Sequence, residues 1–533
     1  MGYHEYYDPV IIAMNKSDAY LLGIDLGTTA TKAALYRIDG SMVGEGRADV
    51  TISHPEPHRV EQDMSEFYES AALATRKCMA SCNADPRAII ALAFDSQMAG
   101  IGALDEDFRP VDKFDSWLDM RCEPFIEQLN LKHRRRITEL TGCPPMCAHG
   151  PKMLWWQHER PADYARISKF VMPVCYVAGR MAGLRIEEAF IDNTFIHFSG
   201  CSDALQGKWS KELCELLGID QRRLPRVVDP TRIVGEVSAS AARDFGLCAG
   251  TVIAAGCGDT AAGALGAGAV YPGMLLDTAG TASVLSVCTD RFFSDTTHFA
   301  LLVSRSVVSH VWTALAYVGG GGLALPWFRE NLLANTPADE SHGLERLLAQ
   351  CESIPPGCDG LIFSPHLGGR TCPPAPAMRG AWIGFTWKHT QAHFTRSIAE
   401  SVAYEYAWYL SIIRKLLPTV NFGDARVIGG GAKSTVWNGI KANILGVPFR
   451  RLQRSESATW GSALIAAKAI GLIDDIAEAA CETASVCTDV IHPDPTSSSV
   501  YLAGFRRYIF WQDKLTTSFE NGSRCNSVST DAG

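Results

Sequence analysis

The sequence predicts an α/β protein made of two similarly built domains that share a cleft. The chain has 533 residues, which is more than one domain of ordinary size contains. A strand–turn–strand unit with an acidic residue before a Gly-Thr turn occurs twice, at Asp25 and at Asp277. The second half of the chain ends in strands that alternate with helices, which is typical of an α/β layer.

The first unit covers residues 19–50. The apolar run "LLGID" ends at Asp25, "LGTTAT" is a tight polar turn, and "KAALYRI", "DG" and "SMVGEGRADV" complete a β-meander. A helix is expected next in "SEFYESAALATRKCMASC". The buried strand "AIIALAF" follows and ends at Asp95.

The second unit, "GMLLDTAGTASVLSVCTD", covers residues 273–290 and repeats the order of apolar run, acid, Gly-Thr turn and apolar run. Each unit would then offer its Gly-Thr turn to a cleft between the domains. A chance match of two strand–turn–strand units is the alternative.

The elements near the C-terminus resemble a nucleotide-binding layer. A long helix is expected in "HFTRSIAESVAYEYAWYLSIIRKLL", a strand in "ARVIGGG", a helix from Ser434 or Thr435 to Gly446, a strand in "VPFRRLQ" and a helix in "TWGSALIAAKAIG". Glycines between a strand end and a helix N-terminus often bind nucleotide phosphates. The stretch "GGGAKST" is not a P-loop, because Ala432 stands where that motif requires Gly before Lys433.

Composition narrows the class of protein. The net charge of −9 argues against a nucleic-acid partner. The 17 cysteines are scattered through a chain with ample core, so a reducing compartment is expected rather than a disulfide framework. Residues 1–17 form an extension without the pattern of a secretory signal, and no apolar run is long enough for a membrane span. We therefore expect a cytoplasmic protein with no membrane partner, and a disordered tail at 519–533.

One acid stands out in "CGDTAAGALGAG", residues 257–268, where every other residue but the first is Gly, Ala, Thr or Leu. A carboxylate among such residues is costly unless something nearby uses its charge. Asp259 is therefore either a helix N-cap or a functional acid, and this stretch alone does not separate the two.

Several stretches together resemble the FGGY carbohydrate kinases. "GIDLGTTATK", "GCGDTAAGALG", "DTAGTAS" and "GGGAKSTVWNGIKANILG" occur in the order and at about the distances found in that family. "PKMLWW", "LGGRTCPPAPAMRG" and "RGAWIGFTWKHTQAHFTRSIAESVAYE" are similar to further family motifs. The resemblance implies two actin-like, ribonuclease H-like ATPase domains with an interdomain cleft, at residues 18–268 and 269–518. ATP, Mg²⁺ and a sugar would meet in that cleft.

The resemblance also implies roles for individual residues. Asp259 is similar to the catalytic base and Asp25 to the Mg²⁺-associated acid, with a turn-capping role as the alternative for Asp25. The phosphate-binding residues would be Gly27, Thr28, Thr29, Lys32, Gly280 and Thr281, although Lys32 is equally open to being a solvated strand residue. The adenosine-binding residues would be Gly430, Gly431, Ala432 and Asn443.

For the sugar, the resemblance is closest to the xylulokinase branch. It implies contacts from Gln97, Met98, Trp117, Asp119 and Arg121, and from Asp192 unless that acid is structural. Ser96 and Ala99 stand where that branch has Gly and His. The expected activity is ATP-dependent phosphorylation of a ketose, with D-xylulose first and another pentulose or a polyol, such as ribulose, as the alternative. A non-catalytic actin-like nucleotide-binding protein and a homodimeric assembly also stay open.

Overall fold

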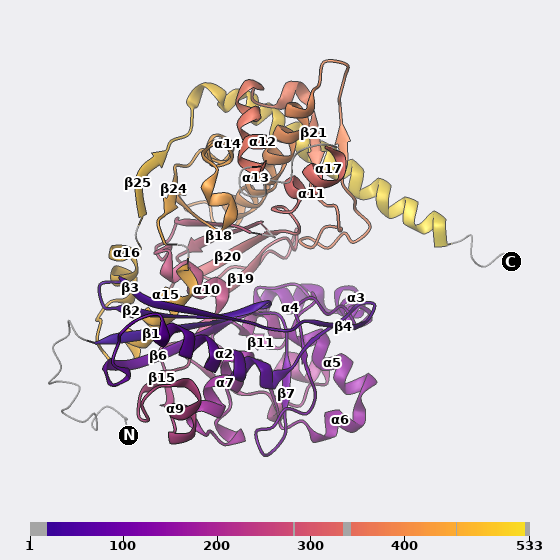
Figure 1. Cartoon of the computed structure of the whole chain (residues 1–533). Helices are drawn as coiled ribbons and strands as arrows, with labels where there is room; N and C mark the ends of the chain where they lie inside the picture. Colours follow the sequence, from indigo (N-terminus) through magenta and orange to yellow (C-terminus); the bar gives the residue numbers. More distant parts are fainter. Residues whose placement is uncertain (1–18, 281–282, 334–342, 455, 485, 528–533) are drawn as a thin grey trace.

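Two large β-sheets, one from each half of the chain, form the framework of the protein (Figure 1). The computed structural model describes residues 19–280, 283–333, 343–454, 456–484 and 486–527. Each sheet has seven strands among the described residues. In Figure 1 the first half lies below and the second half above, with α10 and α15 near the level where they meet.

The first sheet contains the predicted meander and strand. Its order is β14-β15-β6-β1-β2-β3, with β16 beside β6. Strands β1, β2 and β3 pair antiparallel, whereas β6 and β15 run parallel to β1. The strands are β1 Tyr20–Leu26, β2 Ala30–Arg37, β3 Met42–Asp49, β6 Ile89–Ser96, β14 Ile233–Glu236, β15 Val252–Ala254 and β16 Cys257–Gly258.

The second sheet repeats this plan, in the order β19-β20-β18-β17-β23-β24-β25. As around β1, the strands β18 and β20 on one side of β17 pair antiparallel, β23 and β24 on the other side pair parallel, and the outer pair β24–β25 is antiparallel. Strand β19, antiparallel to β20, is an additional edge strand of this sheet. The strands are β17 Leu275–Ala279, β18 Ser283–Thr289, β19 Leu302–Arg305, β20 Trp312–Val318, β23 Ala425–Ile428, β24 Phe449–Leu452 and β25 Val486–Ile491. The repeat is therefore a repeat of the fold, and the chance-match alternative is wrong.

Helices cover both faces of the first sheet because its strands point alternate side chains to opposite sides. Leu22 and Ile24 share one core with α2, α7 and α9, and Leu21 shares another with α10 and α15. These helices are α2 Met64–Ala80, α7 Pro173–Ala182, α9 Ala239–Phe245, α10 Asp259–Gly266 and α15 Ser457–Ala469.

Helix α10 also packs on the second sheet, because its Ala264 lies in a small core with Leu276. In the second half, α11, α12, α13 and α14 share one core with Leu275 and Val287. The helices of this half are α11 Ala324–Leu332, α12 Gly343–Ala349, α13 Gln391–Leu416, α14 Thr435–Leu445, α16 Ile476–Glu482 and α17 Ser498–Ser527. Ser434 caps α14 and Gly446 ends it, as the sequence predicts.

Helix α15 crosses from the second half of the chain to the first sheet. Trp460 and Leu464 of α15 lie in the same core as Leu21 and Tyr36 of the first sheet. Gly23 makes this approach possible, because a Cβ there would lie 1.8 Å from the carbonyl oxygen of Thr459. The predicted boundary at residue 268 thus separates the two sheets but leaves the first sheet without a helix that covers it.

Shorter elements fill the space around the two sheets, mostly in the first half. The remaining strands are β4 Ser53–Glu56, β5 Arg59–Gln62, β7 Gly102–Leu104, β8 Phe114–Asp115, β9 Lys169–Val171, β10 Phe190–Asp192, β11 Ser202–Asp203, β12 Lys208–Trp209, β13 Arg226–Val228, β21 Ile362–Ser364 and β22 Ala381–Ile383. The remaining helices are α3 Glu123–Lys132, α4 Arg134–Thr141, α5 His149–Glu159, α6 Pro161–Arg166 and α8 Lys211–Leu217.

The predicted disordered tail is corrected by α17, which continues to Ser527. Tyr501 and Tyr508 hold the first part of this helix in a small core. Extending an existing helix needs no new nucleus, so polar residues after 519 add turns to it. The predicted extension at 1–17 and residues 528–533 lie outside the described residues.

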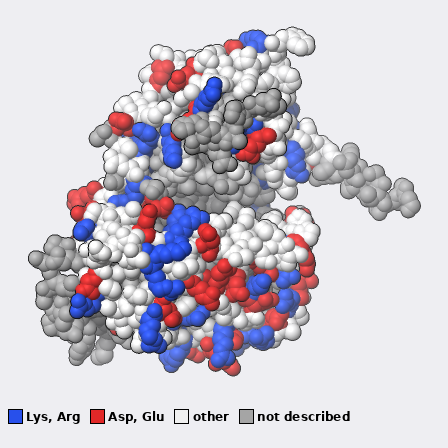
Figure 2. Space-filling view, viewed as in Figure 1, with Lys and Arg blue, Asp and Glu red and all other residues white. Residues whose placement is uncertain are grey.

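Three further observations concern the charged surface, the thiols and the hydrophobicity of the helices. On the face drawn in Figure 2, Lys and Arg side chains lie among Asp and Glu side chains over the first half. No cysteine pair forms a disulfide in the described part of the chain. Within the same residues, no helix combines the length and the apolar run that crossing a membrane requires.

Candidate functional site

Three carboxyl groups gather where strands of the first sheet end. Asp25 of β1 is opposite Asp95 of β6 in the parallel register, and Cys257 of β16 is also opposite Asp95. Asp259 follows β16 directly and begins α10. The carboxyl ends of parallel strands meet at one edge of a sheet, which is where ligands bind in open α/β sheets.

Burial raises the pKa of all three acids, and the charge of Asp25 adds to the rise at Asp95 and Asp259. Burial raises the pKa of Asp259 to about 7, and the nearby charge of Asp25 adds to that rise. Burial raises the pKa of Asp25 to about 6, although the positive charge of Lys32 opposes the rise. Burial and the charge of Asp25 raise the pKa of Asp95 well above its ordinary value. The acids at this edge therefore hold their protons more readily than isolated carboxyl groups do.

Asp259 is not a simple helix cap. Gly258 is the N-cap of α10, and Asp259 is its first helical residue. Its Oδ1 accepts the N–H of Thr260 at 2.6 Å. The residue as a whole is half-buried. The N-cap alternative is wrong, and this position suits an acid that meets a substrate.

The first Gly-Thr turn joins β1 to β2 beside these acids. Gly27 is required there, because a Cβ would lie 2.7 Å from the carbonyl oxygen of Ala30. Thr29 is exposed and Thr28 is half-buried. Lys32 lies opposite Asp25 in the β1–β2 register, and its Nζ is 2.7 Å from Oε2 of Glu456. Lys32 is thus an ion-paired residue beside the turn rather than a freely solvated one.

Two predicted sugar residues are linked to this turn by hydrogen bonds, one of them through Gln62, which the sequence did not single out. Gln62 donates to the carbonyl of Thr28 at 2.9 Å, and Gln97 donates to Gln62 at 2.8 Å. The indole N–H of Trp117 donates to Oγ1 of Thr28 at 3.0 Å. The turn and the predicted sugar wall therefore form one hydrogen-bonded unit.

Met98 lies between this unit and Asp259. A Cβ on Gly258 would come within 2.5 Å of Cε of Met98, so the thioether covers the start of α10 closely. His149 holds the Met98 backbone through a 2.6 Å contact between its Nε2 and the Met98 carbonyl. Burial lowers the pKa of His149 to about 4, which keeps the ring neutral.

Asp119 and Arg121 are already engaged with protein groups. Asp119 accepts the N–H of Val60 at 2.7 Å and pairs with Arg121 at 2.9 Å. Arg121 also lies 2.5 Å from Asp115 and 3.1 Å from Glu61. With three carboxylate partners, Arg121 holds the Trp117 segment in place and has little charge left for a ligand.

Asp192 is a buried supporting acid. Its Oδ1 accepts from both the N–H and the hydroxyl of Thr194, at 2.8 and 2.6 Å. Oγ1 of Thr194 accepts the N–H of Gly258 at 2.9 Å. Hydrogen bonds therefore connect Asp192, through Thr194, to the residue before Asp259. Burial raises the pKa of Asp192 to about 7. These contacts agree with the structural alternative for Asp192.

The predicted adenosine loop lies against the second Gly-Thr turn. Gly429 has a φ of 86°, and a Cβ there would be 2.8 Å from the carbonyl oxygen of Ala279, next to Gly280. Residues Gly430–Lys433 form a 3-10 turn that contains Gly431 and Ala432. The structure thus brings Gly280 and this loop together, whereas Thr281 lies outside the described residues.

Asn443 is not part of that loop. It lies about 12 Å along α14 from the start of the helix, and its Oδ1 accepts the N–H of Asp494 at 2.6 Å. Asn438 takes the position next to the loop instead. Its side-chain amide donates to the carbonyl of Ala432 at 3.0 Å, and its Oδ1 is buried without a partner among the described residues.

The largest difference between the repeated units is at Asp277. Asp277 and Lys441 form an ion pair with both side chains fully buried. The hydroxyl of Tyr406 donates to Oδ1 of Asp277 at 2.8 Å. This acid therefore has its own counter-charge inside the protein.

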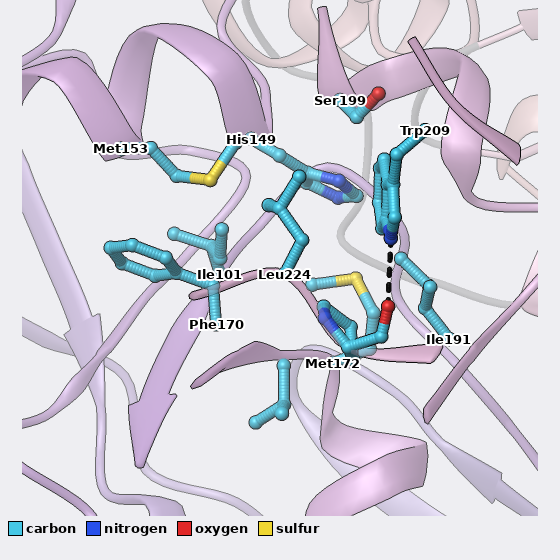
Figure 3. Close-up of a pocket in the computed structure, with 11 residues that line it drawn as sticks. Ile101, His149, Met153, Phe170, Met172, Ile191, Ser199, Trp209 and Leu224 are labelled. Atoms are coloured by element: carbon cyan, nitrogen blue, oxygen red, sulfur yellow. Dashed lines mark hydrogen bonds between the residues drawn. The ribbon is translucent and has the colours of Figure 1, made fainter. Parts of the chain in front are cut away.

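A small apolar pocket lies behind the sugar wall (Figure 3). His149, Met153, Phe170 and Trp209 surround it, and Trp209 donates to the carbonyl of Pro225 at 2.7 Å. None of the three acids lines this pocket. It is therefore not the predicted site.

The acids fit a divalent cation on their own chemistry. Mg²⁺ usually binds one or two carboxylates and keeps waters and substrate phosphates in its other positions. Oδ1 of Asp95 is buried and has no donor among the described residues. Among the described residues, no group of three Asp, Glu, His or Cys side chains is arranged to hold a metal. A nucleotide and water would therefore supply the remaining ligands of the cation.

Family models and known proteins match most of this chain. The N-terminal domain model of the FGGY family of carbohydrate kinases matches residues 20–266, and its C-terminal domain model matches residues 276–470. A xylulose kinase of Staphylococcus epidermidis is 27% identical over 93% of this chain and 98% of its own length. A gluconokinase of Bacillus subtilis is 26% identical over 86% of this chain and 88% of its own length.

Solved structures agree with the fold. The crystal structure of xylulose kinase from Rhodospirillum rubrum superposes with a TM-score of 0.85 at 25% identity, covering 94% of this chain and all of that one. Together, the two domain models, the repeated actin-like sheets and the acids at their strand ends lead to one assignment. The chain belongs to the FGGY family of carbohydrate kinases, near the xylulokinase branch, and is a sugar phosphotransferase.

Proposed function

We propose that this protein transfers a phosphoryl group from Mg²⁺-bound ATP to a ketose, with D-xylulose as the first candidate. The observation that carries the proposal is the position of Asp259. Its carboxyl group is half-buried, starts α10 and lies at the same sheet edge as Asp25 and the Gly27–Thr29 turn.

In the proposed reaction Asp259 accepts the proton of the attacking sugar hydroxyl. A general base works best when its pKa is near the working pH, and burial brings the pKa of Asp259 to about 7. The N–H groups of Gly27, Thr28 and Thr29 would bind the transferring phosphates, and Asp25 would hold Mg²⁺, which supplies charge neutralisation when bound. Gly280 would bind phosphate from the second domain, and Gly430, Gly431 and Ala432 would border the adenine.

The proposed sugar wall consists of Gln97, Met98 and Trp117. Oε1 of Gln97 is buried without a partner among the described residues, so it is available to a sugar hydroxyl. Trp117 is 36% exposed and offers an apolar surface. Asp119, Arg121 and Asp192 would position this wall and the base rather than touch the sugar.

The identity of the sugar is the part of the proposed function that the relatives and the residues of the sugar wall constrain least. Relatives of nearly equal identity include a xylulose kinase and a gluconokinase. Ala99, which is half-buried beside Met98, makes the wall shorter than a His would. Another pentulose or a polyol, such as ribulose, or gluconate therefore stands as the alternative substrate.

A coupled ADP-release assay of the purified protein over pentuloses, hexuloses, polyols and gluconate tests this proposal. D-xylulose is expected to give the highest kcat/KM, with no ADP release from Asp259→Asn above background. Release that does not depend on any sugar, or that survives in Asp259→Asn, would favour a nucleotide-binding protein without sugar kinase activity.

A further inference from the structure

Asp95 is a fully buried carboxyl group that belongs to no predicted site. Its Oδ2 accepts the hydroxyl of Ser462 at 2.7 Å, and its Oδ1 has no donor among the described residues. Leaving a buried carboxylate oxygen without a partner is costly. A group that the protein itself does not supply would remove that cost.

The surroundings of Asp95 call for positive charge. Asp25 is its register partner across β1 and β6, and Asp259 is the other charged residue that acts on it. Both are acids. Lys32, the cation on the neighbouring strand, is held by Glu456 at 2.7 Å. The carboxyl groups of Asp25 and Asp95 therefore lie beside each other, and the nearby cation Lys32 is shared with Glu456.

Ser462 fixes the direction of the Asp95 carboxyl group. It lies on α15, which packs across the first sheet, and its side chain is fully buried. Because its hydroxyl occupies Oδ2, Oδ1 is the oxygen left to a ligand. A residue that orients a metal-binding carboxylate in this way is a positioning residue.

We propose that Asp95 is a second carboxylate of the divalent-cation site, together with Asp25, and that Ser462 positions it. This inference rests on the proposed function and deepens it by naming a cation-binding residue. Two carboxylates are within the number that Mg²⁺ takes from a protein when a nucleotide and water complete its shell.

Binding of Mn²⁺ to the full-length protein, without nucleotide or sugar, tests the inference by electron paramagnetic resonance of the free ion. Asp95→Asn is expected to weaken Mn²⁺ binding by at least about ten-fold, and Asp25→Asn by a similar factor. Ser462→Ala should give a smaller loss in the same direction. The matched control is Asp295→Asn, which alters a fully buried carboxyl group bonded to the N–H groups of His298 and Ala300. Its Mn²⁺ affinity should equal that of the wild type.

The outcomes separate this inference from the proposed function. A folded Asp95→Asn protein with wild-type Mn²⁺ affinity, or a wild-type protein that binds no Mn²⁺, overturns the inference while sugar-dependent ADP release still stands. If Asp95→Asn does not fold by circular dichroism, Ser462→Ala decides in the same way. Weakened Mn²⁺ binding in a protein that phosphorylates no sugar keeps the cation site and removes the proposed function.

Discussion

Asp25 and Asp277 occupy equivalent positions in two equivalent sheets, yet their surroundings are opposite. Each lies in the central strand that leads into a Gly-Thr turn, Asp25 in β1 and Asp277 in β17. Asp25 is half-buried beside two further acids, and burial raises its pKa to about 6. Asp277 is fully buried against the ammonium group of Lys441 and the hydroxyl of Tyr406.

This difference shows how one structural unit serves two purposes. An acid without a counter-charge at a sheet edge stores unfavourable electrostatic energy that a bound cation relieves. An acid with a buried partner holds its sheet to a helix and leaves nothing for a ligand. The same strand–turn–strand pattern in the sequence therefore predicts the location of a turn, but not which of its acids does chemistry.

The largest expected effect is on stability and comes from the second unit. Asp277→Asn would leave the buried Lys441 without a counter-charge and lower the free energy of unfolding by about 3–5 kcal/mol. Urea denaturation measures this change. Asp25→Asn is the matched control and should not lower stability, because it removes a carboxyl group from a cluster of like charges. Equal losses in both variants would contradict the contrast.

The second-largest expected effect is on catalysis and concerns Asp259, at the edge of the first sheet. Asp259→Ala should reduce kcat by at least about 10²-fold, the contribution of a general base. ATP should still bind, as isothermal titration calorimetry would show. Turnover near that of the wild type would make Asp259 a structural residue.

A third prediction concerns the sugar wall next to the first turn. Ala99→His should shift the preference toward D-xylulose by on the order of 1–3 kcal/mol if the imidazole gains a hydrogen bond to the sugar. The measurement is the ratio of kcat/KM for D-xylulose to that for the other sugars. An unaltered ratio would show that position 99 does not contact the substrate.

The fourth prediction concerns the pH dependence of the rate. Asp259 must be ionised to accept a proton, so kcat/KM should fall as the pH drops through about 7. The charge of Asp25 contributes to that raised pKa. Asp25→Asn should therefore move the acidic fall of the pH–rate profile to lower pH. Asp277→Asn should leave unchanged the pH at which kcat/KM falls. A shift of that pH in Asp277→Asn would show that the two units are electrostatically coupled.

The smallest effect is on stability as a function of pH. Because the pKa of Asp259 is raised in the folded chain, that chain binds more protons than the unfolded chain between about pH 4 and pH 7. Its contribution to the free energy of unfolding is therefore present at low pH and lost as the pH rises through about 7. Denaturation at several pH values should show a shallower fall in Asp259→Asn than in the wild type.

Much of this fold is local and could be predicted from the sequence. Apolar runs, the Gly-Thr turns and the caps at Ser434 and Gly446 specify their elements without help from distant residues. The packing of α15 on the first sheet could not be predicted, because its Ala-rich pattern suits any close approach and its partner, Gly23, is far away in the chain.

The site was predictable only in part. Asp25, Asp259 and the turn residues lie in recognisable motifs. Asp95, Gln62 and Thr194 act through contacts that tertiary structure creates, and no spacing in the sequence signals them. Asn438 and Asn443 lie on one helix, but only Asn438 is close enough to the helix start to contact the loop, whereas Asn443 bonds Asp494.

The crossing of α15 also sets an order of events during synthesis. The first sheet is complete in sequence by residue 268, but the helix that covers one of its faces ends at residue 469. At about 5–20 residues per second, the ribosome needs roughly 10–40 s to make the intervening segment. Through that interval the apolar face around Leu21 and Tyr36 has α10 over it but lacks α15. A nascent chain stalled in this window is therefore a natural client for chaperones, and a fragment ending before α15 should be insoluble when expressed alone.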